Sequence, residues 1–348
     1  MKNKIKSLSK KIRKNSSSEN SSQLAKVTNN TLEAERKEIL NKGRKYKYPV
    51  QYSKRKLVIN TVIIAVIIVV VGVVALWQQL YVAQSSNDLI YRISTVLPLP
   101  VANVDGENVL YSDYLADYRA NMVLSKKKEG TLELIKDEKA RSDAYKKQAM
   151  ENAIRNAYAL KLARENSISA SSEEIEAAFK EQRNVNGSEI SETAFNKIIE
   201  DNYGLSPSEY RRMFIELPLI RQKVMAKIDD TALKLKDQVQ AFIKSQGSDF
   251  SKIAEKFGDS IEIGASGTVK LSNVDGGRTA VALKLEPGQI SDAFVSKSGD
   301  GYYFVKLISK NSKELSYEYI KVNFTEFDKR LEQLEKDGKI SKYIKIEE

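Results

Sequence analysis

The chain of 348 residues contains neither cysteine nor histidine. The absence of cysteine excludes disulfides, thiolate metal sites and a lipid-modified N-terminal cysteine. The absence of histidine removes the commonest metal ligand and the commonest acid/base group. Serine-based hydrolysis would then need a Ser-Lys arrangement, and no motif points to one. The sequence also has no glycine-rich phosphate-binding loop, so we expect no cofactor and no metal.

Acidic residues are scarce in the first part of the chain. Residues 1–56 hold 17 Lys and Arg against 4 Glu, a net charge of +13, whereas the remainder holds 40 basic and 42 acidic residues. Aromatic residues are absent until Tyr46, so little apolar surface offsets the entropy of ordering this tail. We expect residues 1–56 to be largely disordered, apart from a short helix over 31–41. Because the remainder is nearly neutral, nucleic-acid binding is not predicted.

Residues 57–77 form one apolar run, LVINTVIIAVIIVVVGVVALW, without a charged side chain. A helix of this length spans roughly 31 Å, close to the roughly 30 Å hydrocarbon core of a bilayer. The run predicts a transmembrane helix over 57–80. A cleaved signal peptide is the competing interpretation, but its apolar region would be only about 7–15 residues long. A buried core helix is disfavoured because it is rarely apolar on every face.

The flanks of this run predict its orientation. Basic residues 54–56 directly precede it, whereas Trp77 and Tyr81 follow it with no charge until Asp88. By the positive-inside rule the N-terminus is cytoplasmic and the rest of the chain extracytoplasmic. We therefore expect a single-pass protein of the cell membrane. Its basic tail either binds anionic lipid or only fixes the topology.

The next part of the chain predicts a mainly helical domain over 101–228. Residues 81–100 end in Leu-Pro-Leu-Pro and are expected to be an extended linker, because proline disfavours helix. Residues 101–109 are typical of a strand pair that turns at an Asp-Gly dipeptide. Helix starts follow at Ser112, at Ser171 with Glu174, and at Ser206 with Pro207 and Glu209. The last of these helices is expected to kink at Pro218.

The serial order of these caps and turns resembles the N-terminal helical domain of SurA-type chaperones and the related PrsA foldases. The resemblance covers roughly residues 100–228 and rests on VDGE before a helix, then ENSISASSEEIEAAFKEQ, then YGLSPSEYRR before a final long helix. In that family the domain cradles unfolded clients on apolar surface. The resemblance implies Phe179, Tyr210 and Phe214 as candidate peptide-binding side chains. The alternative is an ordinary helical domain whose apolar positions are all internal core.

Residues 229–325 resemble a parvulin domain, the peptidyl-prolyl isomerase module usually found downstream of that helical domain. The resemblance rests on DFSKIAEKFGDS, GASGTVKL, LKLEPGQISDAF and GDGYYFVKLISK, in this order. Parvulins begin with a strand that carries a histidine, and no such strand lies between Lys227 and Lys234. Residues 316–322, SYEYIKV, are the candidate replacement. A strand there, beside the last parvulin strand, would make the module circularly rearranged.

The residues at the implied parvulin site depart from the family pattern. Parvulin activity depends on a pair of histidines beneath a proline pocket lined by Phe and Met or Leu. Carried onto this sequence, the two histidines fall on Tyr303 and Tyr319, and the pocket phenylalanine falls at or near Arg278. Val281 and Phe294 complete the candidate pocket. The rotation barrier of a planar X-Pro amide is roughly 18–20 kcal/mol, and we do not expect this site to lower it efficiently. The alternative is that the two tyrosines are cross-strand packing residues.

The end of the chain is expected to return to the helical domain. Residues 326–336 predict a charged helix, and residues 340–346 alternate like a strand. In SurA-like proteins the C-terminal segment completes the N-terminal domain, which implies pairing of this strand with residues 101–104. A disordered tail is the alternative. The expected fold class is α+β, with one transmembrane helix, a mainly helical chaperone domain and a small parvulin-like α/β domain.

These patterns together predict a membrane-anchored extracytoplasmic chaperone or foldase. Its expected partners are unfolded or nascent exported polypeptides and membrane lipid, and it uses no nucleotide. The parvulin-like module is expected to be catalytically degenerate. Two alternatives stay open, namely an active parvulin-type peptidyl-prolyl cis-trans isomerase and a structural or assembly partner in an envelope complex.

Overall fold

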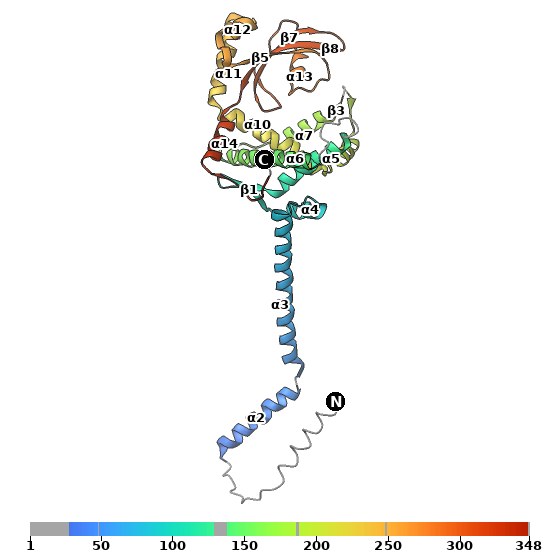
Figure 1. Ribbon diagram of the computed structural model, residues 1–348, viewed down its shortest axis with the longest axis vertical. Coiled ribbons are helices and arrows are strands. Elements are labelled where there is room, and N and C mark those ends of the chain that lie inside the picture. The colour runs from blue at the N-terminus through green and yellow to red at the C-terminus, as the bar shows by residue number, and fades with distance from the viewer. Residues whose placement is uncertain (1–27, 48, 129–137, 186–187, 248, 347–348) are drawn as a thin grey trace, which may run out of the picture. The chain divides into compact units, whose positions relative to one another are not determined.

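The computed structural model describes residues 28–47, 49–128, 138–185, 188–247 and 249–346. The chain divides into two units, Met1–Val74 and Ala75–Glu348. The first unit contains α2 (Asn29–Lys47) and most of α3 (Pro49–Trp77), both shown in Figure 1.

The helical content of the first unit exceeds the sequence prediction. Only a short helix was expected before the apolar run, yet α2 and the first two turns of α3 are helical. An i,i+4 ion pair between Glu38 and Lys42 (2.6 Å) supports α2. Helix propagation from an established helix is much easier than nucleation, which explains why α3 begins ahead of the apolar residues. The disorder expected for residues 1–27 lies outside the described residues.

Arg55–Val82 is the one helical stretch of the described chain that is long and apolar enough, by length and composition, to cross a membrane. No residue in its most apolar window is buried inside the protein. A core helix of a soluble domain would be mostly covered. The most apolar window of this stretch is therefore not covered by any part of the chain that the structure describes.

A three-stranded antiparallel sheet joins the two ends of the second unit. β1 (Pro100–Val104) and β2 (Glu107–Leu110) form the expected hairpin, with positive φ angles at Asp105 (49°) and Gly106 (85°) in the turn. β9 (Ile340–Lys342) pairs with the other edge of β1, with Val104 opposite Ile340. This is the pairing that the family resemblance implied for the end of the chain.

Helices surround this sheet and form, with it, what we call the helical body, residues 75–228 and 326–346 (Figure 1). They are α4 (Asp88–Val96), α5 (Tyr111–Lys128), α6 (Glu138–Glu165), α7 (Ser172–Gln182), α8 (Glu192–Tyr203), α9 (Pro207–Arg211), α10 (Leu217–Ile228) and α14 (Glu326–Lys336). A hairpin of β3 (Asn184–Val185) and β4 (Ser188–Glu189) follows α7. The expected capping boxes at Ser171 and Ser206 are both present. Ser112 is no cap, because α5 already begins at Tyr111, directly after β2.

Residues 81–100 differ from the expected linker. The π-helical turn η1 (Gln78–Val82) leads into α4, whose N-cap Asn87 accepts a hydrogen bond from the Ile90 amide at 2.9 Å. Leu80, Ile90 and Tyr91 are buried in the core of the body. The two prolines lie after α4 has ended, so they do not prevent it.

A second π-helical turn, η2 (Arg212–Glu216), lies just ahead of Pro218, where a kink was expected. The Leu217 amide donates to the Arg212 carbonyl, five residues back. Proline has no amide hydrogen and its ring crowds the carbonyl four residues before it, so a widened turn just ahead relieves the conflict. The helix continues as α10 beyond it.

The residues from 229 to 325 form a second part, which we call the sheet module. It begins with α11 (Asp230–Gln246), α12 (Phe250–Phe257) and the 3₁₀ turn η3 (Gly258–Ser260). Its remaining elements are β5 (Glu262–Lys270), α13 (Arg278–Ala282), β6 (Phe294–Val295), β7 (Gly301–Lys310) and β8 (Glu314–Asn323). The strands form one antiparallel sheet in the order β5-β8-β7-β6. β8, which contains residues 316–322, therefore lies directly beside β7.

Side-chain alternation along β7 gives the sheet two covered faces. Tyr302 and Phe304 belong to the main core, which is continuous with the interior of the helical body. Val305 and Leu307 belong to a separate core under α13. Because successive strand residues point to opposite faces, one strand contributes to both cores. The helical body and the sheet module thus share one hydrophobic interior.

Candidate functional site

Five candidate residues of the sheet module lie together against the sheet, and we call them the sheet cluster: Arg278, Val281, Phe294, Tyr303 and Tyr319. Phe294 faces Tyr303 across the β6–β7 pair, with ring centroids 6.1 Å apart. Tyr303 and Tyr319 are diagonal neighbours on β7 and β8, 5.7 Å apart. Val281, from α13, packs on the same small core as Phe294 and Tyr319.

Arg278 occupies the centre of this cluster. Its guanidinium carbon lies 4.7 Å from the Tyr319 ring centroid and 5.2 Å from that of Tyr303. Its Nε donates to the Asp275 carbonyl at 2.9 Å, which fixes the direction of the side chain. A guanidinium held between two aromatic faces gains cation–π attraction from both. The position where the family resemblance puts a pocket phenylalanine is thus filled by a charged, hydrogen-bonded group.

A polar network supports the far side of Tyr303. The Tyr303 hydroxyl donates to Asp300 Oδ2 at 2.9 Å, and Lys321 Nζ lies 2.8 Å from the same oxygen. Burial raises the pKa of Asp300, but the hydrogen bonds from Lys321 and Tyr303 outweigh it and hold the pKa below its ordinary value. Burial and the neighbouring Asp300 raise the pKa of Tyr303, so the phenol stays neutral. Tyr303 therefore acts as a hydrogen-bond donor here and not as a base.

Glycine lets the Tyr319 ring lie flat across the neighbouring strand. A Cβ atom at Gly264 of β5 would lie 2.4 Å from atoms of the Tyr319 phenol, closer than real Cβ atoms approach. Gly264 is opposite Tyr319 in the β5–β8 register. The Tyr319 ring of β8 therefore packs over Gly264, where β5 has no side chain in its way.

The peptide-binding candidates gather in a different place. Phe179, Tyr210 and Phe214 pack with Phe195 and Tyr203 in a small core of α7, α8, α9 and η2. We call these five rings the lobe cluster and the elements around them, residues 172–216, the lobe. Neighbouring centroids lie 5.0 Å apart for both Tyr203–Tyr210 and Tyr210–Phe214, and 5.4 Å for Phe179–Phe195. Such spacings are typical of well-packed aromatic groups.

Two arginines cover the lobe cluster from outside. The Arg211 guanidinium carbon lies 3.9 Å from the Phe179 centroid, and that of Arg183 lies 5.8 Å away. Arg211 also pairs with the exposed carboxylates of Glu176 and Glu192. Phe179 is only 1 % exposed and Tyr210 only 7 %. The structure brings the three candidates together, but in this conformation the rings of Phe179 and Tyr210 are interior.

A shallow groove that the sequence did not predict lies between α10 and β6. It has a volume of about 410 Å³ and a mostly apolar lining, made by Leu219, Gln222, Lys223, Ala226, Lys227 and Val295. Gln222 Nε2 donates to the Ser296 carbonyl at 2.6 Å beside it. The groove is built from residues 70 positions apart, so no local pattern in the sequence could have indicated it.

Asp229 is a second feature that sequence reasoning missed. Its side chain is buried, with 2 % of the residue exposed. Oδ1 accepts from the Ala232 amide, and Oδ2 accepts from the amides of Thr325 and Glu326. One carboxylate thus caps α11 and the start of α14 together. It fixes the point where the chain leaves the helical body and the point where it returns.

Within the described ranges, no three or more acidic side chains are grouped so that they could hold a metal ion. The fold and these clusters define a class of protein, namely a helix-rich α+β protein whose C-terminal strand closes its own N-terminal sheet. A family model described as the SurA-like N-terminal domain matches residues 50–245, more than half of the chain. The chain therefore belongs to the SurA-like N-terminal domain family. A comparison with curated proteins gave no match.

The family match confirms one resemblance seen in the sequence. It begins in α3 and ends in α11, so it contains the lobe and α10 but not the sheet of the module. A SurA-like N-terminal domain is consistent with a chaperone that binds unfolded polypeptide. The parvulin resemblance and the membrane span stay predictions.

Proposed function

We propose that this protein is a membrane-anchored chaperone that binds unfolded exported polypeptides outside the cytoplasm and uses no nucleotide. The observation that carries the proposal is the match of the SurA-like N-terminal domain to residues 50–245, which include residues 75–228 of the helical body. The return of β9 to β1 adds support, because it gives the body the closed form that the resemblance implied.

The proposed anchor is the apolar stretch that ends at Val82. Its apolar side chains from Leu57 to Val74 are exposed to the surroundings of the protein, whereas Leu76, Leu80 and Tyr81 near its end pack against the body. The basic excess of residues 1–56 supports a cytoplasmic N-terminus by the positive-inside rule. The body then lies on the outer side, where exported polypeptides emerge.

The proposed client surface is the groove between α10 and β6, extended by the lobe cluster when the lobe opens. The groove is accessible in this conformation and mostly apolar, which suits an extended unfolded segment. The lobe cluster forms a core of its own, and exposed ion pairs of Arg211 hold its outer side. Exposed pairs each contribute only about 0–1 kcal/mol, so these ion pairs oppose opening of the lobe only weakly.

The sheet module is proposed to be a parvulin-like domain that has lost efficient catalysis. The position of β8 beside β7 supports the circular rearrangement that the sequence suggested. Arg278 between Tyr303 and Tyr319 supports the loss, because a proline ring would need the space that the guanidinium fills. The module then serves as a support for the groove, to which it contributes Val295.

Aggregation of a denatured client tests the chaperone proposal. The full chain in nanodiscs is added to the client, and light scattering is followed with and without ATP. We expect suppression at equimolar chain, equal in both conditions, and no effect of empty nanodiscs. Absence of suppression at excess chain would refute the proposal. Val295→Asp is expected to weaken suppression, whereas Val274→Asp, at a 94 % exposed valine of the same module, is the matched control.

An active peptidyl-prolyl isomerase is the second candidate, favoured by the strand order of the sheet module. A protease-coupled assay on an X-Pro peptide separates the two. We expect a rate near the uncatalysed one, because the amide-straining pocket is filled and the chain has no histidine. A rate that rises in proportion to the concentration of the chain would instead establish the isomerase.

A further inference from the structure

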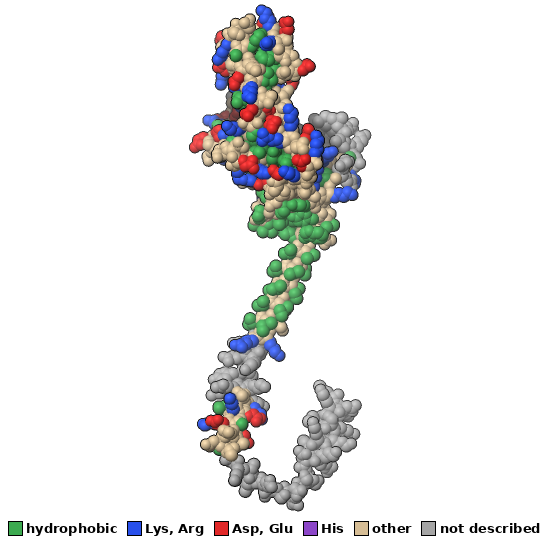
Figure 2. All heavy atoms as spheres, turned by 90° about the vertical axis from the view of Figure 1, so that its left-hand side faces the viewer, with side chains coloured by type: hydrophobic (Ala, Val, Ile, Leu, Met, Phe, Trp, Pro, Cys, Tyr) green, Lys and Arg blue, Asp and Glu red, His purple; other side chains and the backbone are tan. Residues whose placement is uncertain are grey.

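α4 presents an apolar face that nothing in the described chain covers. Leu89 and Val96, seven residues apart and therefore on one side of the helix, are 69 % and 79 % exposed. Val82 before the helix and Leu97 after it are also exposed. We call these four side chains the α4 face. Figure 2 shows hydrophobic side chains gathered on the body at the end that carries η1 and α4.

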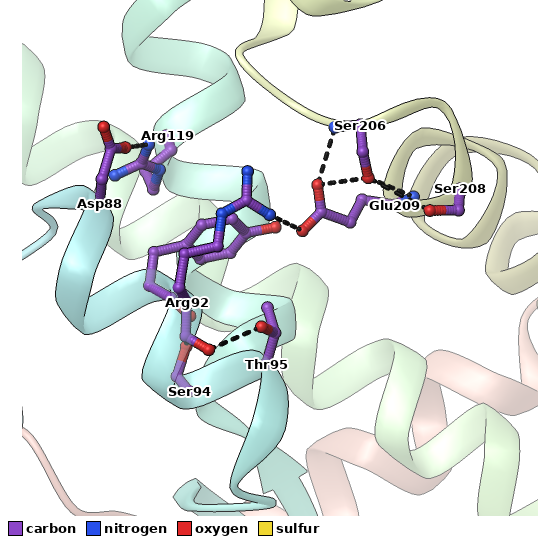
Figure 3. A network of polar contacts seen from close by, with 9 residues as sticks. Asp88, Arg92, Ser94, Thr95, Arg119, Ser206, Ser208 and Glu209 are labelled. Carbon is purple, nitrogen blue, oxygen red and sulfur yellow. Dashed lines mark hydrogen bonds and ion pairs between the residues drawn. The ribbon is translucent and has the colours of Figure 1, made fainter.

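The buried side of α4, together with polar contacts at its ends, keeps this face outward. Arg92 Nη1 donates to Glu209 Oε1 at 3.1 Å, and Glu209 is itself part of the capping box of α9 (Figure 3). Arg119 pairs with Asp88 and also donates to the Ser86 carbonyl. The buried ring of Tyr91 packs between α4 and the body, with the Arg119 guanidinium 4.8 Å from its centroid. Because the opposite side of α4 is buried in the body, Leu89 and Val96 stay outward.

The α4 face lies close in the chain to the end of the proposed anchor. Asp88 follows Val82 by six residues, and an extended chain covers at most about 3.6 Å per residue, so the two lie within about 22 Å. The chain turns back and does not extend, since the Ser85 amide donates to the Gln79 carbonyl. The end of the anchor is also part of the body, because the Tyr111 hydroxyl donates to the Leu80 carbonyl at 2.5 Å.

The residues around the α4 face have the composition of a membrane interface. Trp77 is 56 % exposed and Tyr343, at the end of β9, is 46 % exposed. Gln84 Nε2 donates to the Lys345 carbonyl at 2.7 Å, which brings an exposed lysine beside η1. Trp and Tyr favour the headgroup level of a bilayer, and lysine favours anionic headgroups.

We propose that the α4 face rests on the outer surface of the lipid bilayer and forms a second membrane contact beside the anchor. The proposal rests on the membrane anchoring proposed above. Interfacial helices bury their apolar side about 5–10 Å into the headgroup boundary, and Leu89 and Val96 are the α4 side chains that would enter it. The contact would hold the body, including the lobe that Glu209 joins to α4, at a fixed height above the membrane.

Site-specific labelling tests this contact, because the chain has no native cysteine. An environment-sensitive fluorophore is attached to Val96→Cys in the full chain, reconstituted in vesicles with lipids spin-labelled at the headgroup level. Val274→Cys is the matched control, a valine that is also highly exposed but lies in the sheet module. We expect at least about twofold stronger quenching at residue 96, independent of the protein-to-lipid ratio. Leu89→Cys should behave like Val96→Cys.

A third label separates this inference from the anchoring on which it rests. Val66→Cys, in α3, reports on the anchor through lipids spin-labelled deep in the acyl chain. Quenching at residue 66 together with equal, weak quenching at 96 and 274 would overturn the α4 contact and leave the anchor standing. No quenching at residue 66 would overturn both. Shielding of residue 96 that grows with protein concentration, without lipid quenching, would show that a second copy covers the face and would also overturn the proposal.

Discussion

The lobe cluster and the sheet cluster both hold an arginine against aromatic rings, but the arginine has a different place in each. Arg211 lies outside a core of five rings and pairs with Glu176 and Glu192 at the surface. Arg278 lies between the rings of Tyr303 and Tyr319. Moving Arg211 would uncover apolar surface, whereas moving Arg278 would leave a hole lined by phenols.

This difference separates the two functions that the sequence left open. A chaperone needs apolar surface that can become accessible, and the lobe has it behind weak, solvent-exposed ion pairs. A prolyl isomerase needs a preformed pocket that grips a ring, and Arg278 stands at the position that the parvulin resemblance gives to a pocket ring. The proposed function therefore places polypeptide binding in the helical body and expects no efficient catalysis in the sheet module.

The largest expected effect comes from the most buried ring of the lobe cluster. Phe179→Ala removes a side chain that is 1 % exposed, and such truncations cost about 3–5 kcal/mol. Urea unfolding of the full chain measures the loss, with Val274→Ala as a control that should change little. Hydrogen exchange should rise in residues 172–203 more than in the sheet module. A loss below about 1 kcal/mol would show that the lobe is not a packed core.

The junction between the two regions should be nearly as sensitive. Asp229→Ala leaves three backbone amides without their acceptor, and we expect a loss of about 2–4 kcal/mol. Asp230→Ala, at the exposed neighbouring aspartate, is the matched control. Thermal unfolding followed by circular dichroism compares them. Equal melting temperatures for the two variants would contradict the double cap.

The two arginines allow a direct test of the comparison. Arg278→Ala should cost about 2 kcal/mol through lost cation–π contacts and one hydrogen bond, and Arg211→Ala about 1 kcal/mol. Because the ion pairs of Arg211 are exposed, 1 M salt should shrink its effect and leave that of Arg278 nearly unchanged. Urea titrations at low and high salt measure both. If 1 M salt shrank the effect of Arg278→Ala and left that of Arg211→Ala unchanged, the contrast drawn between the two arginines would be wrong.

The smallest expected effect is a pH dependence in the sheet cluster. The pKa of Asp300 is lowered in the folded protein, so its contribution to stability is present above the unfolded pKa of about 3.9 and is lost as the pH falls through the lower folded value. Asp300→Asn should therefore be less stable than the native chain at pH 6, and the gap should narrow as the pH falls below the unfolded pKa. A gap that stays constant or widens in acid would contradict the proposed network.

Local rules predicted much of the fold. The capping boxes at Ser171 and Ser206 and the turn before Gly106 depend on neighbouring residues, and each is where the sequence indicated it. The order of these signals also carried the family resemblance, which the SurA-like match confirms. The pairing of β9 with β1 came from that resemblance and not from any local signal.

What the sequence did not predict depends on tertiary contacts. α4 is stabilised by Glu209 and Arg119, which are distant in the chain, so its segment resembled a linker. The Asp229 carboxylate accepts hydrogen bonds from the amides of Thr325 and Glu326, which only the folded chain brings beside it. For Phe179, apolar character indicated a binding surface equally well as a core, and only packing distinguishes the two. The sequence named the candidate rings but could not decide their exposure.

Hydrogen exchange of the full chain in nanodiscs, with and without a permanently unfolded client polypeptide, tests the central claim most directly. The proposal predicts client-dependent protection that is strongest in α7 to α10 of the helical body and unaffected by ATP. Protection confined to α13 and β7 around Arg278 would contradict it in favour of a working proline pocket. No protection anywhere, at client concentrations that saturate aggregation suppression, would contradict polypeptide binding by this body altogether.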